Sequence, residues 1–527
     1  MAKRFNITGS CDRNKHYMVD IEERLQEIRD LVDQGAYFSM NRGRQYGKTT
    51  TLNQLREYLC GEYLVASLDF QFLTQEDFRT EYAFAAAFAN RFVKAVQQEQ
   101  EMQEGLTDAL KKCAKERDCS LSVLFEELSE FCRNAPKPVI LMIDEVDSAS
   151  NNEVFVDFLA LLRGYYLHRT EEAIFQSVIL AGVYDIKRLR QKIRGEGEHK
   201  TNSPWNIAAD FDVDMDLHVS GIREMLLAYE RDYHTGMNPD EMSELIYAYT
   251  SGYPFLVSRI CKLLDEKIAG TSEFPTRAGA WTKEGFLAAE KMLLVEKNTL
   301  FESLIHRLEE YPYLREMIYS LLFEGARITY NPYHFVIDMA SMFGFVKNEN
   351  GAMVIANRIF EVLLYNWFLS EEEVNSRIFS EGTMDKNQFV QDGFLNMDMV
   401  LKRFMVHWGE LYGGADEKFL EDNGRKLFLL YLKPIINGVG NYYIEARTRD
   451  GGRTDVIVDY RGRQYIIELK IWRGNAYNDR GERQLAEYLD AYQIKEGYMV
   501  SFNFNKNKTV GAKEIMMDGR RILEVVV

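Results

Sequence analysis

The first 220 residues alternate short apolar runs with helix-like segments. Four of these runs are almost continuously apolar, which is typical of strands buried on both faces of a parallel sheet. They cover residues 36–40 (AYFSM), 63–69 (YLVASLD), 139–143 (VILMI) and 177–181 (SVILA). Because helical stretches separate them, the pattern predicts an α/β domain with a parallel sheet over residues 1–220.

Between residues 221 and 375 the apolar positions recur mainly at helical spacing. One hairpin pattern, at residues 345–355, interrupts the helices and is followed by another helix, which predicts a winged helix. We therefore expect a helical lid over 221–270 and a winged-helix-like domain over 271–375. The polar stretch 371–387 indicates a linker, assigned to 376–400, before a last domain over 401–527.

A second hairpin pattern lies near the C-terminus. Residues 454–459 (TDVIVD) and 464–470 (QYIIELK) are β-rich, and residues 460–463 (YRGR) separate them. Glu468 and Lys470 share a strand face, and Asp455 stands on the other strand. Two carboxylates hold Mg²⁺, and an adjacent lysine orients or deprotonates a water. The pattern indicates metal-dependent phosphodiester hydrolysis, and a hairpin with incidental charges is the alternative.

A glycine loop follows the first predicted strand. Its sequence, NRGRQYGKTT at residues 41–50, leads into a helical segment. Backbone N–H groups and the helix N-terminus are expected to hold phosphates, with Lys48 on the β and γ oxygens and the Thr49 hydroxyl on Mg²⁺. The usual first glycine would fall at Arg42, so this loop departs from the common pattern. The nucleotide-binding residues expected here are Gly43, Arg44, Gln45, Tyr46, Gly47, Lys48, Thr49 and Thr50.

An acidic strand end supplies the expected partner of this loop. The apolar run at 139–143 ends in Asp144 and Glu145, at the edge where open α/β sheets bind ligands. We expect Asp144 to hold the magnesium through water and Glu145 to activate the attacking water. The alternative is an acidic strand end that caps the next helix. The strand ending at residues 181–185 lies where a γ-phosphate sensor is expected.

Net charge and cysteine content limit which partners and which cellular compartment are expected. The net charge of −17 argues against nucleic acid, yet residues 401–527 carry 21 Lys+Arg against 18 Asp+Glu. A mildly basic C-terminal part is compatible with local phosphate contacts, or with chance sampling of surface charge. The six cysteines form no C-x-x-C pair and predict reduced, cytoplasmic thiols. No apolar stretch reaches 18 residues, which argues against membrane insertion.

These motifs together resemble a bacterial and archaeal family that joins an AAA-like, STAND-type P-loop ATPase to a C-terminal PD-(D/E)XK nuclease. The resemblance also rests on residues 5–9 (FNITG), 203–207 (SPWNI) and 250–256 (TSGYPFL). It implies a restriction-endonuclease-like α/β fold for residues 401–527. It further implies that Tyr253 and Pro254 lie near the adenine, although Pro254 also suits a plain helix start.

The resemblance assigns the nuclease core residue by residue. Its catalytic members are Asp455, Glu468, Lys470, Gln484 and Tyr488, with metal held by Asp455, Glu468 and the Leu469 carbonyl. The expected protein hydrolyses ATP and uses its nucleotide state to control a nuclease that needs Mg²⁺ or Mn²⁺. Expected partners are nucleic acid, DNA in preference to RNA, and a second copy of the chain. The alternative is a nucleotide-dependent switch whose nuclease-like domain only binds nucleic acid or protein.

Overall fold

The computed structural model describes residues 3–97, 105–115, 118–149, 152–183, 205–323, 326, 328–373, 375–413, 417–437, 439–444, 455–471, 482–483, 485–486, 489–490, 493–503 and 509–527. The chain divides into two compact units. The first comprises Met1–Tyr233, Gly252–Arg259 and Met342–Gly344. The second comprises His234–Ser251, Ile260–Ser341 and Phe345–Val527.

A parallel four-stranded sheet forms the centre of the first unit. Its strand order is β3 (Tyr37–Asn41), β6 (Ser177–Gly182), β5 (Val139–Asp144) and β4 (Leu64–Asp69). All four strands predicted from the apolar runs are present, so the prediction of an α/β fold with a parallel-sheet core is confirmed. An isolated parallel bridge joins Phe38 of β3 to Ala209.

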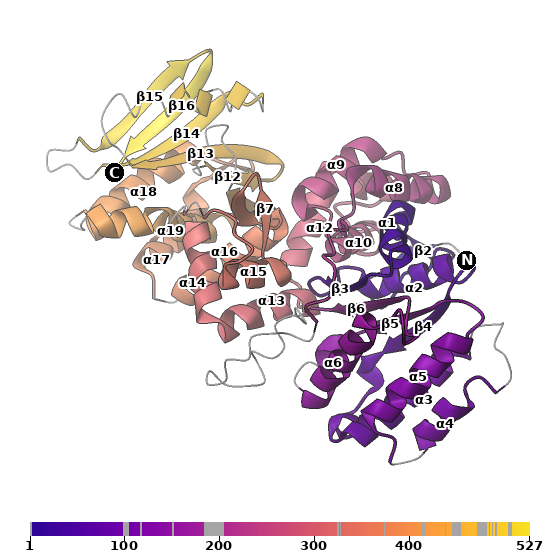
Figure 1. Ribbon diagram of the computed structural model, residues 1–527. Coiled ribbons are helices and arrows are strands. Elements are labelled where there is room, and N and C mark those ends of the chain that lie inside the picture. The colour runs from indigo at the N-terminus through magenta and orange to yellow at the C-terminus, as the bar shows by residue number, and fades with distance from the viewer. Residues whose placement is uncertain are drawn as a thin grey trace. The chain divides into compact units, whose positions relative to one another are not determined.

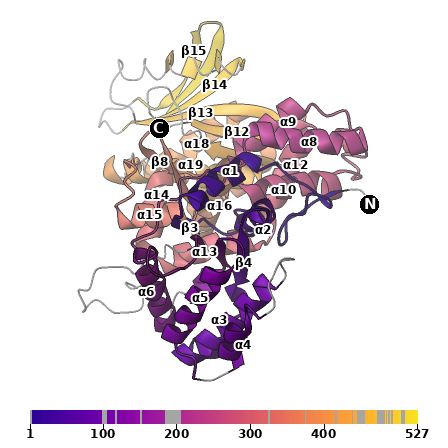
Figure 2. The same cartoon turned by 45° about the vertical axis from the view of Figure 1, so that its right-hand side comes forward.

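Helices cover both faces of this sheet (Figures 1 and 2). One face packs against α1 (Glu22–Asp33) and α2 (Lys48–Leu59), and the other against α3 (Glu81–Val96), α5 (Leu121–Asn134) and α6 (Glu153–Leu167). Alternate residues of one strand enter the two cores: Ile140 faces α1 and α2, whereas Leu141 faces the opposite helices. Burial of such a side chain stabilises the fold by about 1.5–3 kcal/mol. This two-sided burial explains why the strands read as unbroken apolar runs.

The other elements of the first unit are short or peripheral. They are β1 (Arg4–Phe5), β2 (His16–Tyr17), η1 (Phe70–Phe72), η2 (Gln75–Phe78), α4 (Asp108–Lys115), η3 (Val146–Ala149) and α8 (Val219–Tyr233). Helix α10 (Pro254–Leu263) contributes residues to both units.

Cys113 and Cys119, both buried, form a disulfide with their Cα atoms 5.3 Å apart. The expectation of reduced thiols is therefore wrong for this pair, because α4 and the residues just before α5 bring them together.

The second unit contains most of the remaining helices. They are α9 (Pro239–Thr250), η5 (Leu264–Ile268), α11 (Arg277–Ala280), α12 (Lys283–Val295), α13 (Thr299–Glu310), α14 (Pro312–Phe323), α15 (Phe335–Met342), α16 (Arg358–Glu373), α17 (Arg377–Asp385), η6 (Lys386–Gln388), α18 (Met397–Tyr412) and α19 (Glu417–Ile436). The predicted hairpin is formed by β7 (Val346–Glu349) and β8 (Ala352–Ile355). The winged helix around it stays a prediction.

Residues 376–400, expected to be a linker, hold α17, η6, the start of α18 and a small hairpin of β9 (Val390–Gln391) and β10 (Phe394–Leu395). Asp385 at the end of α17 is buried and accepts hydrogen bonds from Arg403 and Tyr431. None of the described helices combines the length and apolar character needed to cross a membrane.

A mixed six-stranded sheet forms the C-terminal part of the second unit. Its order is β11 (Gly440–Ile444), β12 (Asp455–Tyr460), β13 (Arg463–Ile471), β14 (Glu496–Phe502), β16 (Arg520–Val526) and β15 (Gly511–Met517). Strands β13, β14 and β16 run parallel, and the other neighbours pair antiparallel. The predicted hairpin of β12 and β13 is confirmed. Its turn, Arg461 and Gly462, has φ of 52° and 77°, as a two-residue turn of the tight hairpin type requires.

Candidate functional site

The loop between β3 and α2 has the backbone of an anion cradle. Gln45 and Gly47 both have positive φ, 57° and 81°, and Gly47 directly precedes the first residue of α2. Glycine adopts this conformation without the steric cost that a Cβ imposes. The N-terminus of α2 carries backbone N–H groups and the positive end of the helix dipole, which together favour an anionic ligand.

Lys48 is buried at the start of α2, with only 8% of its surface exposed. Its Nζ donates to the carbonyl oxygens of Arg42 and Gly43, at 2.9 and 3.0 Å. Burial lowers the pKa of this ammonium, while Asp147, Glu145 and Asp144 act in the opposite direction. The lysine is thus a cation held by the loop backbone and surrounded by acids, close to where the loop would hold phosphates.

Thr49 and Asp144 join the loop to the end of β5. The Thr49 hydroxyl donates to Asp144 Oδ2 at 2.6 Å, although the two residues are 95 positions apart in the chain. Both are hard oxygen donors of the kind that Mg²⁺ takes in proteins. The structure therefore brings together the two residues that the sequence assigned to one magnesium ion, and their chemistry fits that ion.

Glu145 follows Asp144 in a rare backbone conformation. Its φ of 54° lies in the left-handed region, which costs a non-glycine residue on the order of 1–3 kcal/mol. Burial raises the pKa of its carboxyl group, and the neighbouring Asp144 charge raises it further. A carboxylate with a raised pKa suits proton transfer near neutral pH. Asp69, at the end of β4 and in register with Asp144, adds a further acid that the sequence did not single out.

Two segments distant in sequence hold the loop from outside. The Tyr253 hydroxyl, which is buried, donates to the Arg44 carbonyl, and the Tyr253 ring meets the Tyr46 ring at 4.5 Å. The Tyr46 hydroxyl in turn donates to the Asp216 carboxylate. A Cβ on Gly43 would lie 3.2 Å from the Phe343 carbonyl oxygen and 3.3 Å from the Tyr253 hydroxyl. Tyr253, expected near the adenine, thus contacts the loop backbone, and its place beside a nucleotide stays a prediction.

The remaining loop residues have separate surroundings. The side chains of Arg44 and Gln45 are exposed. Thr50 lies one residue further into α2, and its hydroxyl accepts a hydrogen bond from the Cys11 N–H at 3.0 Å. Thr50 therefore holds the N-terminal segment, which leaves Thr49 as the hydroxyl that faces the acidic strand end. Only tertiary contacts separate the roles of these adjacent threonines.

The C-terminal sheet presents a second buried charged site. Glu468 and Lys470 of β13 are 2% and 8% exposed, and Lys470 Nζ lies 3.5 Å from Glu468 Oε1. Asp455 is the cross-strand partner of Glu468 in the β12–β13 register. Leu469 lies between Glu468 and Lys470 in β13. It is also buried, and its side chain is on the opposite face of the strand. The register of the predicted hairpin thus places Asp455 opposite Glu468.

A buried network lies on the same face, two strands away. Glu524 of β16 is fully buried, accepts from the Ser501 hydroxyl at 2.5 Å and pairs with Lys513 at 2.7 Å. Lys513 also reaches Glu482 at 3.1 Å, and Ser501 is in register with Lys470. Glu524 is an acid within the apolar part of β16 (ILEVV), and this signal could have indicated the network.

Gln484, Tyr488 and the side chain of Asp455 lie outside the described residues. Within the described part of the chain, no group of three or more His, Cys, Asp or Glu side chains is arranged to hold a metal ion. The C-terminal site thus stands on the Glu468–Lys470 pair and the backbone register of Asp455.

Comparison with known proteins places the first site in a family context. The model of the family described as "AAA-like domain" matches residues 9–362, which include the glycine loop and the acidic strand end. No curated protein matches the chain.

Three solved structures with similarity to the chain are all distant in sequence. A Walker-type ATPase of Pyrococcus abyssi is 13% identical, with a TM-score of 0.45 over 68% of this chain and 99% of its own. The Aeropyrum pernix ORC1 protein, in complex with DNA, is 12% identical, with a TM-score of 0.31 over 67% and 94%. Thermotoga maritima RuvB is 12% identical, with a TM-score of 0.33 over 64% and 92%.

Proposed function

The chain belongs to the AAA-like domain family of P-loop ATPases, and from that premise we propose that it binds ATP with Mg²⁺ and hydrolyses it. The observation that carries the proposal is the hydrogen bond between Thr49 and Asp144, with Lys48 buried in the same loop. It joins the phosphate loop to the acidic strand end across the sheet. A plain helix-capping role for the acidic strand end does not account for that contact.

Each residue has a chemical task in this proposal. The loop N–H groups and Lys48 bind the phosphates. Because they neutralise the negative charge of the phosphate oxygens, they favour attack at the γ-phosphorus. Thr49 and Asp144 are the residues that would hold Mg²⁺, which supplies positive charge next to the phosphate oxygens. Glu145, whose pKa is raised, accepts a proton from the attacking water.

The test is ATP hydrolysis by the full-length chain with Mg²⁺, compared with Lys48→Ala. Losing the phosphate-binding ammonium should lower kcat/KM by about 100-fold or more. Lys94→Ala, on the exposed surface of α3, is the matched control and should keep wild-type activity. Wild-type protein that neither binds nor hydrolyses ATP would refute the proposal. Equal hydrolysis in Lys48→Ala would remove the loop from the mechanism.

We also propose that residues 401–527 form a metal-dependent PD-(D/E)XK nuclease under the control of the nucleotide site. The support is the buried Glu468–Lys470 pair in register with Asp455, since buried charges are retained where a partner or a metal needs them. Asp455, Glu468 and the Leu469 carbonyl would hold Mg²⁺ or Mn²⁺. Lys470 would orient the water, and Gln484 and Tyr488 would complete the site.

A cleavage assay tests the nuclease. Full-length protein and Lys470→Ala are incubated with DNA and with RNA, in Mg²⁺ or Mn²⁺, with and without ATP. We expect cleavage of DNA in preference to RNA, and a loss of about 100-fold or more in Lys470→Ala, because the water is no longer oriented. Lys386→Ala, an exposed change, is the control. A change of cleavage rate with ATP that vanishes in Lys48→Ala would establish nucleotide control.

The alternative function is a nucleotide-dependent switch whose C-terminal domain binds without cutting. Its support is the contact of Lys470 with Glu468, which satisfies both buried charges without a metal. It predicts no cleavage in any metal, unchanged behaviour of Asp455→Ala, and an altered oligomeric state or partner binding in Lys48→Ala. We further propose a cytoplasmic location, a homo-oligomer, and the domain boundaries at 220, 270, 375 and 400.

A further inference from the structure

The turn after β5 holds Glu145 in its left-handed conformation through local contacts. The Glu145 N–H donates to Asp144 Oδ1 at 2.9 Å. Its carbonyl oxygen accepts from the Ser148 N–H at 3.2 Å and from the Ser148 hydroxyl at 2.9 Å. These contacts shape the turn within residues 144–148. The Ser148 hydroxyl also contacts the Phe70 carbonyl oxygen, just after β4, at 3.2 Å. None of these contacts joins the turn to β6.

Asp147 joins the turn to β6. Its Oδ2 accepts a hydrogen bond from the backbone N–H of Val183, at the end of β6, with a distance of 2.6 Å. A Cβ added to Gly182 would lie 2.9 Å from Asp147 Oδ1 and 2.8 Å from a methyl group of Val146. Such distances are well inside van der Waals contact. The close approach of this carboxylate to β6 therefore depends on glycine at position 182.

The same point of β6 also contacts the phosphate loop. The Arg42 N–H donates to the Gly182 carbonyl at 3.2 Å, and β6 lies between β3 and β5 in the sheet. One short contact thus links the acidic turn to the end of β6 and, through Gly182, to the first residue of the phosphate loop.

Asp147 also carries charge near Lys48. Its carboxylate raises the pKa of Lys48 against the effect of burial, as do Glu145 and Asp144. Two physical roles are therefore separable. Asparagine keeps a side-chain oxygen that can accept from Val183 but removes the charge, whereas alanine removes both.

We propose that Asp147 is a positioning residue for ATP hydrolysis, whose hydrogen bond to the Val183 N–H fixes the Glu145 turn against the end of β6 and the phosphate loop. The inference rests on the proposed ATP hydrolysis and goes beyond it by assigning a role to a residue outside the proposed phosphate and metal ligands. Its task is to hold the water-activating carboxylate at a constant distance from the loop.

The test compares Asp147→Ala, Asp147→Asn and Gly182→Ala in the full-length chain, with exposed Asp157→Ala on α6 as the control. We expect Asp147→Ala to lower kcat about 10- to 100-fold, because a misplaced catalytic group costs turnover. The dissociation constant for ATP should stay within about twofold. Asp147→Asn should retain kcat within about threefold of wild type, and Gly182→Ala should resemble Asp147→Ala.

Wild-type kcat in Asp147→Ala would overturn the inference, and so would an Asp147→Asn protein as impaired as Asp147→Ala, because charge would then be the essential property. A parallel loss of ATP affinity would also overturn it. If wild-type protein does not hydrolyse ATP, the proposed function fails, and hydrogen exchange at Val183 decides on the contact separately. Faster exchange in Asp147→Ala but not in Asp147→Asn supports the contact, and equal exchange in all three proteins refutes it.

Discussion

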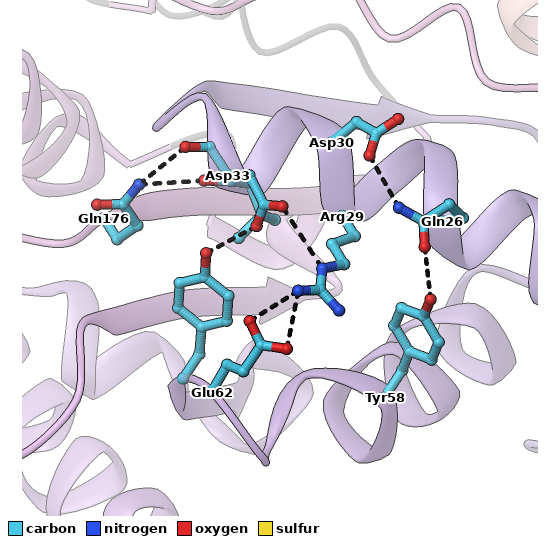
Figure 3. Close-up of polar contacts among 9 residues, drawn as sticks. Gln26, Arg29, Asp30, Asp33, Tyr58, Glu62 and Gln176 are labelled. Carbon is cyan, nitrogen blue, oxygen red and sulfur yellow. Dashed lines mark hydrogen bonds and ion pairs between the residues drawn. The ribbon is translucent and has the colours of Figure 1, made fainter.

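The two edges of the N-terminal parallel sheet differ in how their polar and charged side chains are arranged. At the amino edge, side chains from α1, the α2–β4 connection and the segment before β6 form hydrogen bonds and ion pairs with one another (Figure 3). At the carboxyl edge, the acids that end and follow β5 lie near one buried lysine, and Asp69 ends the adjacent β4 in register with Asp144. Both edges are polar, but at the second edge two non-glycine residues, Gln45 and Glu145, adopt left-handed backbone.

The amino edge shows complementary pairing. Arg29 donates to both carboxylate oxygens of Glu62, at 2.8 and 2.7 Å, and Tyr63 donates to Asp33 at 2.7 Å. Gln176 donates to the carbonyl oxygens of Val32 and Asp33 at the end of α1, at 3.3 and 3.4 Å. These contacts satisfy groups that the end of a helix leaves without intrahelical partners. This edge therefore stabilises the fold.

The carboxyl edge keeps an arrangement that the fold alone does not favour. Asp69 and Asp144 end adjacent strands in register, and burial raises the pKa of Asp69. Gln45 and Glu145 both adopt positive φ. Strain and like charge persist where the surrounding structure holds them for function. Substitutions at this edge should therefore alter hydrolysis, whereas those at the amino edge should alter only stability.

The largest expected effect that separates the edges is that of Glu145→Gln. Removing the group that accepts the proton from water should lower kcat about 100- to 1000-fold, with ATP binding retained. The measurement is kcat at saturating ATP together with the dissociation constant. Gln26→Ala at the amino edge is the control and should leave both values unchanged. A parallel loss of binding and turnover would contradict a role in water activation.

The pH dependence sharpens this expectation. Burial raises the pKa of Glu145, so the carboxylate needed as a base is present above that pKa and is lost as pH falls through it. In wild-type protein kcat should therefore decline on the acid side at a pH above the ordinary range of a glutamate. The profile should be flat over that range in Glu145→Gln. A decline that persists in the variant would assign the titration to another group.

Tyr253→Phe should have an intermediate effect. It deletes the hydroxyl that holds the Arg44 carbonyl and leaves the ring against Tyr46. A net hydrogen bond contributes about 0.5–1.5 kcal/mol, so ATP should bind roughly 2- to 10-fold more weakly. Tyr58→Phe removes a tyrosine hydrogen bond of 2.7 Å to Gln26 at the amino edge and should not change ATP affinity. Equal effects of the two changes would remove the distinction between the edges.

Gln176→Ala should have the smallest effect. The loss of its hydrogen bonds to the end of α1 should destabilise the protein by about 0.5–1 kcal/mol. Thermal or denaturant unfolding measures this change, and ATP hydrolysis below the transition should equal that of wild type. A substantial fall in kcat without loss of stability would show that the amino edge also serves catalysis.

Much of the fold and of the candidate site was predictable from the sequence, because a local sequence pattern indicates local structure. Apolar runs located all four strands of the N-terminal sheet, since burial on both faces leaves no room for alternation. Two β-rich runs separated by YRGR predicted the hairpin that carries Asp455, Glu468 and Lys470, and the C-terminal sheet confirms this hairpin. The pairing of Thr49 with Asp144 followed from the rule that parallel strands expose their carboxyl ends at one edge.

Contacts between distant segments were not predictable in the same way. Tyr253 reaches Arg44 across 209 positions, and Asp147 meets Val183 across 36. The adjacent Thr49 and Thr50 differ in role only because Cys11 contacts one of them and Asp144 the other. Neither periodicity nor residue type distinguishes such partners.

The sequence by itself thus determined the strands, the phosphate loop, the acidic strand end and the spacing of the C-terminal charges. These depend on burial periodicity and on chemistry carried by neighbouring residues. Only the tertiary structure decided which hydroxyl faces Asp144, which tyrosine holds the loop, and how Asp147 anchors the Glu145 turn. The physical reason is that close packing selects contact partners by their shape, wherever they stand in the chain. The close approaches at Gly43 and Gly182 are examples.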